Sequence, residues 1–253
     1  MDLSVTFLGT GGPVPTALRN TASVLVTRGG GKWRCDCGEG TQRQMRCSVG
    51  LTPVDQIYLT HFHLDHCLGL PGLLKTYDLG DRTEPMRIFG PAGLEKLLSD
   101  WHPMIGRLGF HLEVEEIAAG DIIAHDGYEI EVFKAEHSAP NAVGYAMLED
   151  DRPGRFDPEV ARELGVAEGP DFKLLQSGQA VTGSKGEVRP DQVMDEDRFG
   201  RAIVLTGDTG PSQATVVAAA DADLLIHDSS FMTEDIERAG ETGPICRAHH
   251  GSL

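Results

Sequence analysis

The feature that most constrains this chain is the segment at residues 60–66, which reads Thr-His-Phe-His-Leu-Asp-His and follows a run typical of a strand. In an extended chain, residues two apart point the same way, so His61 and His63 can bind one metal ion together. A turn after these two can direct Asp65 and His66 toward a second metal ion. Imidazole and carboxylate ligands suit zinc, and manganese or iron are also compatible with them. The segment therefore predicts a metal centre at the end of a strand.

Two residues farther along the chain are further candidate ligands. His137 follows a strand-like stretch, and Asp208 follows an apolar run and lies in a Gly-Asp-Thr-Gly segment. Both lie where a predicted strand meets a loop, which is the usual place for a site on a rigid scaffold. The alternatives are a capping or surface histidine and a turn aspartate, because Gly-Asp-Thr-Gly is also a good turn sequence. The metal motif at residues 60–66 favours ligands at both positions.

Alternating and apolar stretches predict strands through most of the chain, and helices are fewer. The predicted strands are residues 3–8, 22–26, 56–60, 111–117, 128–133, 202–206 and 222–227, and the predicted helices are residues 91–101 and 211–220. A length of 253 residues fits one large domain, or a sandwich-type domain with an insertion. Residues 149–200 are that insertion, because their core periodicity is poor and Gly and Pro recur in them. Their apolar residues suffice for a small folded arm, and a disordered linker is the alternative.

The net charge of −17 limits the partners that this chain can bind. A chain this acidic repels a polyanion at low salt, which by itself argues against a nucleic-acid partner. Two conditions remove the conflict: clustering of the basic residues on one face, or function in concentrated salt that screens the repulsion. Lysine is also scarce, and an acid-rich, lysine-poor composition suits a salt-loving organism.

Neither membrane insertion nor secretion is indicated. No apolar run approaches 18 residues, and the N-terminus lacks the basic and apolar regions of a signal peptide, so a cytoplasmic protein is predicted. The five cysteines are an odd number in a chain that is not small, which favours reduced thiols over a disulfide framework. Cys35 and Cys37 have the spacing of a metal-binding pair, but no second pair accompanies them.

Residues 60–66 resemble the signature motif of the metallo-β-lactamase superfamily. Other segments narrow the resemblance to the ribonuclease Z family of tRNA 3′-processing endonucleases. They are Phe-Leu-Gly-Thr-Gly-Gly at 7–12, Asp-Cys-Gly-Glu-Gly-Thr-Gln at 36–42, Cys-Leu-Gly-Leu-Pro-Gly-Leu-Leu at 67–74 and Thr-Gly-Asp-Thr at 206–209. The resemblance extends from about residue 3 to about residue 243. Glyoxalase II and the lactamases share the metal motif and lack the other segments.

The resemblance implies an α/β fold over residues 1–253, the four-layer αββα sandwich of the metallo-β-lactamases, with metal ions at one edge. It implies two Zn²⁺ ions per subunit, bridged by Asp208, with these ligands: His61, His63 and His137 for the first ion, and Asp65 and His66 for the second. The implied reaction removes the 3′ trailer from precursor tRNA, by attack of metal-activated water at the phosphate after the discriminator nucleotide. Asp65 is the implied catalytic residue, which orients or deprotonates that water. The native metal and the fate of precursors that contain CCA stay open.

Residues 149–200 match the flexible tRNA-binding arm that the family inserts into this domain, and Gly169 and Pro170 resemble its Gly-Pro motif. The resemblance implies a homodimer in which the arm of one subunit serves the site of the other. Acidic residues are as frequent as basic ones here, so a solvated mixed-charge surface is the alternative. Three residues near the motifs are candidates to support the metal ligands from behind, with structural roles as the alternative: Asp36, Glu39 and His227.

The end of the chain departs from the family pattern. Family members continue with a His-Ser-Thr motif, a helix, and a final strand that ends in the last ligand of the second zinc ion. Residues 244–253 read Pro-Ile-Cys-Arg-Ala-His-His-Gly-Ser-Leu instead. We therefore expect an atypical tail, from a truncation or a shifted reading frame, a sandwich without its last helix and strand, and an incomplete second zinc site. His249 and His250 are candidate substitute ligands.

Two other functions stay open at this point. One is a general metal-dependent phosphodiesterase that acts on other substrates, and the arm argues against it because only tRNA recognition needs an arm. The other is a truncated remnant with impaired catalysis, which the departure at residues 244–253 motivates.

Overall fold

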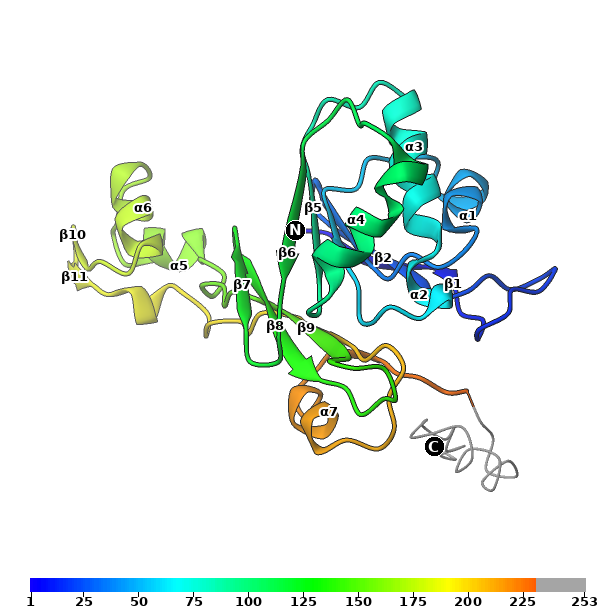
Figure 1. The fold of residues 1–253 in the computed structure, drawn as a ribbon. Coiled ribbons are helices and arrows are strands. Elements are labelled where there is room, and N and C mark those ends of the chain that lie inside the picture. The colour runs from blue at the N-terminus through cyan, green and yellow to red at the C-terminus, as the bar shows by residue number, and fades with distance from the viewer. Residues whose placement is uncertain (231–253) are drawn as a thin grey trace. The chain divides into compact units, whose positions relative to one another are not determined.

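The computed structural model describes residues 1–230, and the chain divides into two compact units (Figure 1). Of the described residues, the sandwich unit comprises residues 1–124, 130–147 and 203–230. The arm unit comprises residues 125–129 and 148–202. The candidate metal ligands with a described structure all lie in the sandwich unit.

The first sheet has six strands in the spatial order β1-β2-β3-β4-β5-β6. Their bounds are β1 (Leu3–Gly9), β2 (Ser23–Arg28), β3 (Gly31–Cys35), β4 (Gln56–Tyr58), β5 (Met86–Gly90) and β6 (Leu112–Glu116). The pairings from β1 to β3 are antiparallel, and those from β3 to β6 are parallel. Since β3 and β4 are parallel neighbours, the segments that follow them emerge at the same edge of the sheet. Asp36 and the motif at residues 60–66 are those segments.

The second sheet has five strands in the order β13-β12-β9-β8-β7. Their bounds are β7 (Ile122–His125), β8 (Tyr128–Lys134), β9 (Val143–Glu149), β12 (Ala202–Leu205) and β13 (Leu224–Ile226). Aromatic rings join the two sheets: Tyr58 of β4 lies edge-on to Tyr145 of β9, with ring centroids 5.3 Å apart. The Tyr145 hydroxyl also donates a hydrogen bond of 2.5 Å to the carbonyl of Leu59. The sheets therefore pack face to face around a buried aromatic core.

Helices cover the outer faces of the sandwich, which gives the order αββα (Figure 1). Helices α1 (Thr41–Ser48), α2 (Leu64–Cys67), α3 (Gly69–Leu79) and α4 (Leu94–Ile105) accompany the first sheet, and α7 (Gln213–Ala218) accompanies the second. Helix α3 shows why the sequence folds this way. Its buried residues recur at helical spacing, which places them on one face toward the core: Leu70, Leu73, Leu74 and Tyr77. The expected four-layer sandwich is therefore confirmed.

Helix α4 differs from the helix predicted over residues 91–101. It begins only after Gly93, whose φ of 105° is in the left-handed region and interrupts a helix. It continues to Ile105, so that Leu98 and Ile105 both reach the core. It ends at Gly106, whose φ of 70° is typical of a helix C-terminus.

The arm unit folds around a hydrophobic core of its own. Its elements are α5 (Pro158–Glu163), α6 (Pro170–Gln176), β10 (Val181–Gly183), β11 (Gly186–Val188) and the 3₁₀ turn η1 (Pro190–Gln192). Its buried apolar residues are Ala161, Val166, Leu175, Val181, Val188 and Val193. The rings of Phe156 and Phe172, 4.9 Å apart, pack against them. Gly169 and Pro170 form the start of α6, where proline is well tolerated because its missing N–H has no helical partner.

Several expectations concern residues beyond 230, which lie outside the described part of the chain. These are the atypical tail, the loss of the last helix and strand, and the substitute ligands His249 and His250. Within residues 1–230, no helix combines the length and apolar character needed to cross a bilayer.

Candidate metal centre

The six candidate ligands come from four segments of the sandwich unit and gather at one edge of it. We refer to these residues as the metal cluster: His61, His63, Asp65, His66, His137 and Asp208. His61 and His63 follow β4, Asp65 and His66 lie in the short helix α2, His137 follows β8, and Asp208 follows β12. Two groups have ligand atoms that all lie within 4.8 Å of one another: His61, His63 and His137, and His61, His66 and Asp208.

Imidazole rings crowd the first group. The ring centroid of His61 lies 4.6 Å from that of His63 and 4.7 Å from that of His137. Nε2 of His137 lies 3.1 Å from Nδ1 of His63. Nε2 of His61 and Nδ1 of His137 are buried and have no hydrogen-bond partner among the described residues. Buried polar atoms without partners are costly, so the donor set fits a metal cation that would accept these lone pairs.

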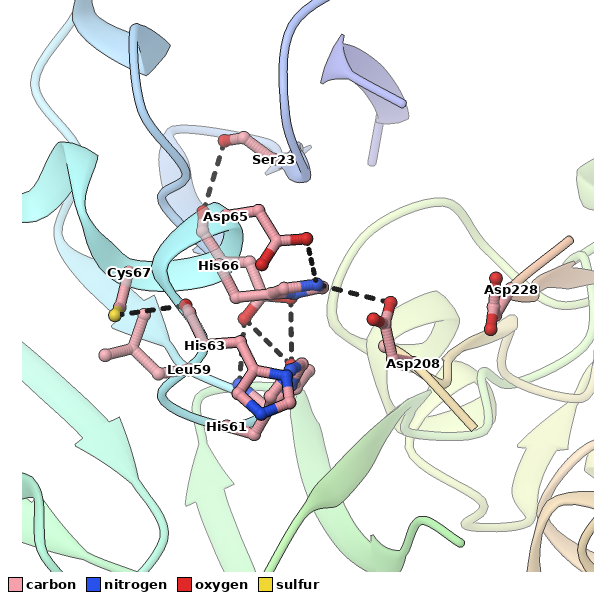
Figure 2. A network of polar contacts seen from close by, with 12 residues as sticks. Ser23, Leu59, His61, His63, Asp65, His66, Cys67, Asp208 and Asp228 are labelled. Carbon is pink, nitrogen blue, oxygen red and sulfur yellow. Dashed lines mark hydrogen bonds and ion pairs between the residues drawn. The ribbon is translucent and has the colours of Figure 1, made fainter. Parts of the chain in front are cut away.

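Two carboxylates, those of Asp65 and Asp208, lie beside the imidazole of His66 (Figure 2). Nε2 of His66 lies 3.2 Å from a carboxylate oxygen of Asp208 and 3.5 Å from one of Asp65. The Asp65 side chain is 9% exposed and that of Asp208 is 28% exposed, so Asp208 is the more open to the cavity. One imidazole and two carboxylates are hard and borderline donors of the kind that Zn²⁺ or Mn²⁺ accepts.

Burial and neighbouring charges shift the pKa values of several residues of the metal cluster. Burial and, after it, the neighbouring His66 lower the pKa of His61 to about 2, so this imidazole is neutral. Burial acts to raise the pKa of Asp208, but the hydrogen bond from His66 and nearby imidazolium charge lower it to about 2. Burial likewise acts to lower the pKa of His66, but the carboxylates around it raise that pKa well above its ordinary value. Both anionic and neutral donors are therefore available.

Asp36 lies directly behind the cluster. Its backbone has a φ of 58°, in the left-handed region that few residues other than glycine adopt. One carboxylate oxygen lies 2.7 Å from Nδ1 of His66, and the other accepts a hydrogen bond of 2.8 Å from the backbone N–H of Thr60. The Ser23 hydroxyl donates to the Asp36 carbonyl at 3.1 Å. Asp36 thus contacts Nδ1 of the candidate ligand His66. The role predicted for Asp36, to support a metal ligand, requires such a contact.

The other two candidate supporting residues lie differently. The Glu39 side chain is exposed, and its described hydrogen bond uses its backbone carbonyl, which accepts from the Thr21 hydroxyl at 3.2 Å. Nδ1 of His227 lies 2.7 Å from the carbonyl of Asp228. Cys35 and Cys37 are buried and belong to neither of the two groups that could hold a metal within the described residues.

A cavity of about 880 Å³ opens over the cluster. The Gly-rich segment at residues 9–13 lines it together with His227. Sequence reasoning missed two further lining residues, Arg19 and Asp228. Burial raises the pKa of Asp228, and one of its carboxylate oxygens is buried without a partner in residues 1–230. No local sequence signal marks Arg19 as a neighbour of the cavity.

Thr209 was also missed, although the Gly-Asp-Thr-Gly segment contains it. It is fully buried, and its hydroxyl oxygen accepts a hydrogen bond of 3.0 Å from the backbone N–H of Glu136. The N–H of Gly210 donates to the Glu136 carbonyl at 2.7 Å. These two bonds join the loop that carries Asp208 to the strand end that precedes His137.

Comparisons with known proteins agree with this geometry. A family model described as a beta-lactamase superfamily domain matches residues 34–159. The chain is 47% identical to a ribonuclease Z from Natronomonas pharaonis, over 96% of this chain and 79% of that protein. It is 45% identical to a ribonuclease Z from Myxococcus xanthus, over 95% of this chain and 78% of that protein. The crystal structure of the short form of human tRNase Z has a TM-score of 0.67 and 25% identity, over 96% of this chain and 84% of that one. The chain therefore belongs to the ribonuclease Z family of the metallo-β-lactamase superfamily.

Proposed function

We propose that the chain is a metal-dependent endoribonuclease that removes the 3′ trailer from precursor tRNA, at the phosphate after the discriminator nucleotide. One observation carries the proposal: a cluster of four histidines and two aspartates, all but His61 lining a large cavity, in a chain almost half identical to proteins named ribonuclease Z. Phosphodiester hydrolysis without a covalent intermediate needs an activated water and charge neutralisation at the phosphate, and such a cluster can hold the ions for both.

The proposed metals are two zinc ions, which when bound polarise the phosphate and lower the pKa of an attacking water. His61, His63 and His137 are the proposed ligands of the first ion, and Asp65 and His66 those of the second. Asp208 is proposed to bridge them. Its low pKa supports this role, because a carboxylate that is ionised at neutral pH can share its two oxygens between cations.

Asp65 is the proposed catalytic residue, which orients or deprotonates the attacking water. The Asp65 carboxylate is 9% exposed, lines the cavity, and lies 3.5 Å from Nε2 of His66. Its place in the first turn of α2 also fixes its direction, since a residue of a buried helix has few rotamers available. The side chain can therefore accept a proton from a water molecule located between it and the substrate phosphate.

The arm unit is proposed to grip the body of the tRNA, with a homodimer in which each arm serves the partner subunit. Its independent hydrophobic core supports a separately folded module. Lys173 is exposed on α6, close to Gly169 and Pro170, and is a candidate contact to phosphate. We propose that the enzyme acts in the cytoplasm.

The deciding experiment incubates the purified chain with a precursor tRNA and Zn²⁺ or Mn²⁺, and maps the new 3′ end. The expected product ends at the discriminator nucleotide. A His63→Ala variant should abolish the cut, and Lys96→Ala, an exposed residue on α4, is the matched control that should retain it. Hydrolysis of a small aryl phosphodiester without any cut in precursor tRNA would instead favour a general phosphodiesterase.

A further inference from the structure

We propose that one buried carboxylate, that of Asp36, orients a ligand histidine at each of the two metal sites. It acts on His66 directly, and on His61 through the hydroxyl group of Thr60. The inference rests on the metal ligands proposed above, and it assigns to Thr60 a positioning role that couples the two sites.

The contact with His66 is direct. An Asp36 carboxylate oxygen lies 2.7 Å from Nδ1 of His66, and the two side chains are only 5% and 3% exposed. A carboxylate can only accept, so the proton of this bond must lie on Nδ1. Nε2 of His66 then faces the carboxylates of Asp65 and Asp208, where a metal would bind.

The contact with His61 passes through Thr60. The Thr60 hydroxyl oxygen lies 2.9 Å from the carboxylate oxygen of Asp36 that also meets His66, and 3.0 Å from Nδ1 of His61. A hydroxyl has one proton, and the carboxylate must receive it. Only a lone pair of the hydroxyl oxygen then faces His61, so Nδ1 of His61 must be the donor. The direction of both hydrogen bonds is thus set by the charge of Asp36.

The resulting tautomer explains the partnerless atom at the centre of the cluster. With its proton on Nδ1, neutral His61 presents a lone pair at Nε2. That nitrogen is buried and has no hydrogen-bond partner in the described part of the chain. We call the hydrogen bonds from Asp36 through the Thr60 hydroxyl to His61 the relay. Without the relay, the two tautomers of the His61 imidazole would differ little in free energy, and in a fraction of the molecules His61 would direct an N–H at the metal site.

The geometry leaves the relay little freedom. The backbone N–H of Asp36 donates to the Tyr58 carbonyl at 2.9 Å, and the backbone N–H of Thr60 donates to the Asp36 carboxylate at 2.8 Å. The Thr60 side chain also packs against Gly207, where an added Cβ would lie 2.7 Å from the Thr60 hydroxyl oxygen. Gly207 precedes Asp208, so Thr60 also contacts the loop that supplies the bridging ligand.

The relay predicts an asymmetry between two substitutions. Thr60→Val keeps the shape of the side chain and removes the hydroxyl, so it should affect only the site of His61. Asp36→Asn removes the carboxylate that contacts both His66 and Thr60, so it should weaken metal binding at both sites. Loss of a group that orients a metal ligand typically lowers metal affinity by about 10- to 100-fold.

The first measurement uses the metal-free full chain and nitrogen-15 NMR of its histidines near pH 7. In the parent chain, His61 should show the Nδ1–H tautomer alone. Thr60→Val should yield a mixture, and Thr60→Ser, which restores a hydroxyl, should return the single tautomer. The matched control is Thr215→Val, which removes a buried hydroxyl that has no partner in residues 1–230. An unchanged His61 tautomer in folded Thr60→Val would overturn the relay.

The second measurement is competition of each variant with a chromophoric chelator for Zn²⁺. Thr60→Val should weaken one zinc site by about tenfold, and Asp36→Asn should weaken both by at least that factor. Equal effects of the two variants on both sites would reject the branched arrangement. Circular dichroism and thermal unfolding confirm that each variant is folded. The tautomer is read without metal or RNA, so a chain that fails to cut precursor tRNA refutes the proposed function and leaves the relay to be judged separately.

Discussion

The metal cluster and the surface of the arm unit both pair carboxylates with cationic side chains, but the pairs differ in burial. Behind the cluster, the Asp36 and His66 side chains are 5% and 3% exposed. In the arm unit, Arg189 and Asp191 are 64% and 68% exposed, and the pair of Arg162 with Glu168 is also open to solvent.

The difference shows where electrostatics can fix geometry. Exposed pairs are screened by water and salt, and their long side chains lose entropy when they pair. Buried polar groups must be satisfied, so each bond behind the metal cluster dictates the direction of the next. The arm pairs have another consequence: Arg162 and Arg189 are neutralised by acids of the arm itself, so these two arginines offer no free positive charge to a polyanion.

A third arrangement lies at the base of the arm unit and is intermediate between these two. The Glu149 side chain is fully buried and pairs with Arg201, at 2.6 Å, and with Arg152, at 2.8 Å. Both arginines are about one-third exposed.

The largest effect is expected at the metal cluster. Asp65→Ala should lower turnover by at least about a hundredfold on every phosphodiester substrate, because it removes the proposed base for the attacking water. Cleavage is measured at saturating Zn²⁺ with precursor tRNA and with a small aryl phosphodiester. Asp100→Ala, an exposed carboxylate on α4, is the matched control. Near-normal turnover in Asp65→Ala would refute the role assigned to this residue.

Deletion of the arm unit should abolish activity on precursor tRNA and preserve activity on a small substrate. The backbone N–H of Glu149 donates to the Arg201 carbonyl at 3.0 Å, so a short Gly-Ser bridge can replace residues 150–200 between these two ends. Cleavage of precursor tRNA should collapse through lost binding, whereas hydrolysis of a small aryl phosphodiester should persist because the metal cluster is untouched. If a folded deletion variant loses both activities together, the arm is not a tRNA clamp.

Glu149→Gln should destabilise the protein without changing hydrolysis of the small substrate. Two guanidinium groups lose a buried anionic acceptor, and hydrogen bonds to charged groups contribute about 1.5–3 kcal/mol, which partial exposure of the arginines reduces. We expect a loss of about 1–2 kcal/mol in the free energy of unfolding, measured with urea. Glu95→Gln, on the exposed side of α4, serves as control. Equal unfolding curves for the two variants would contradict a structural role for this ion pair.

The smallest effect is expected at the surface of the arm unit. Arg162 bonds to Glu159 and Glu168, and all three side chains are exposed. Arg162→Ala should leave the urea midpoint unchanged within error at both low and high salt, because solvent screens such pairs. A clear drop in the midpoint would mean that the exposed pairs of the arm unit act together as a network and stabilise the fold as buried pairs do.

The local chemistry and the family of this protein follow from its amino-acid sequence. Spacing alone placed His61 and His63 on one side of an extended segment, and the apolar pattern predicted strands at β1, β2, β4, β6, β8, β12 and β13 but missed β3, β5, β7 and β9. The predicted strand over residues 56–60 nevertheless ends at Tyr58. The reason is tertiary, because the N–H of Thr60 bonds to the Asp36 side chain instead of a neighbouring strand.

Which distant residues meet depends on how the two sheets pack. His137 and His63 lie 74 positions apart in sequence, yet their ring nitrogens are 3.1 Å apart. Asp36 follows β3 and Thr60 follows β4, and no sequence pattern states that these two strands are parallel neighbours. Burial of apolar residues between two sheets fixes that order, since hydrophobic contacts act through space and are indifferent to sequence separation. Local spacing can therefore reveal a metal motif, but the packing of the sheets decides which side chains complete and orient it.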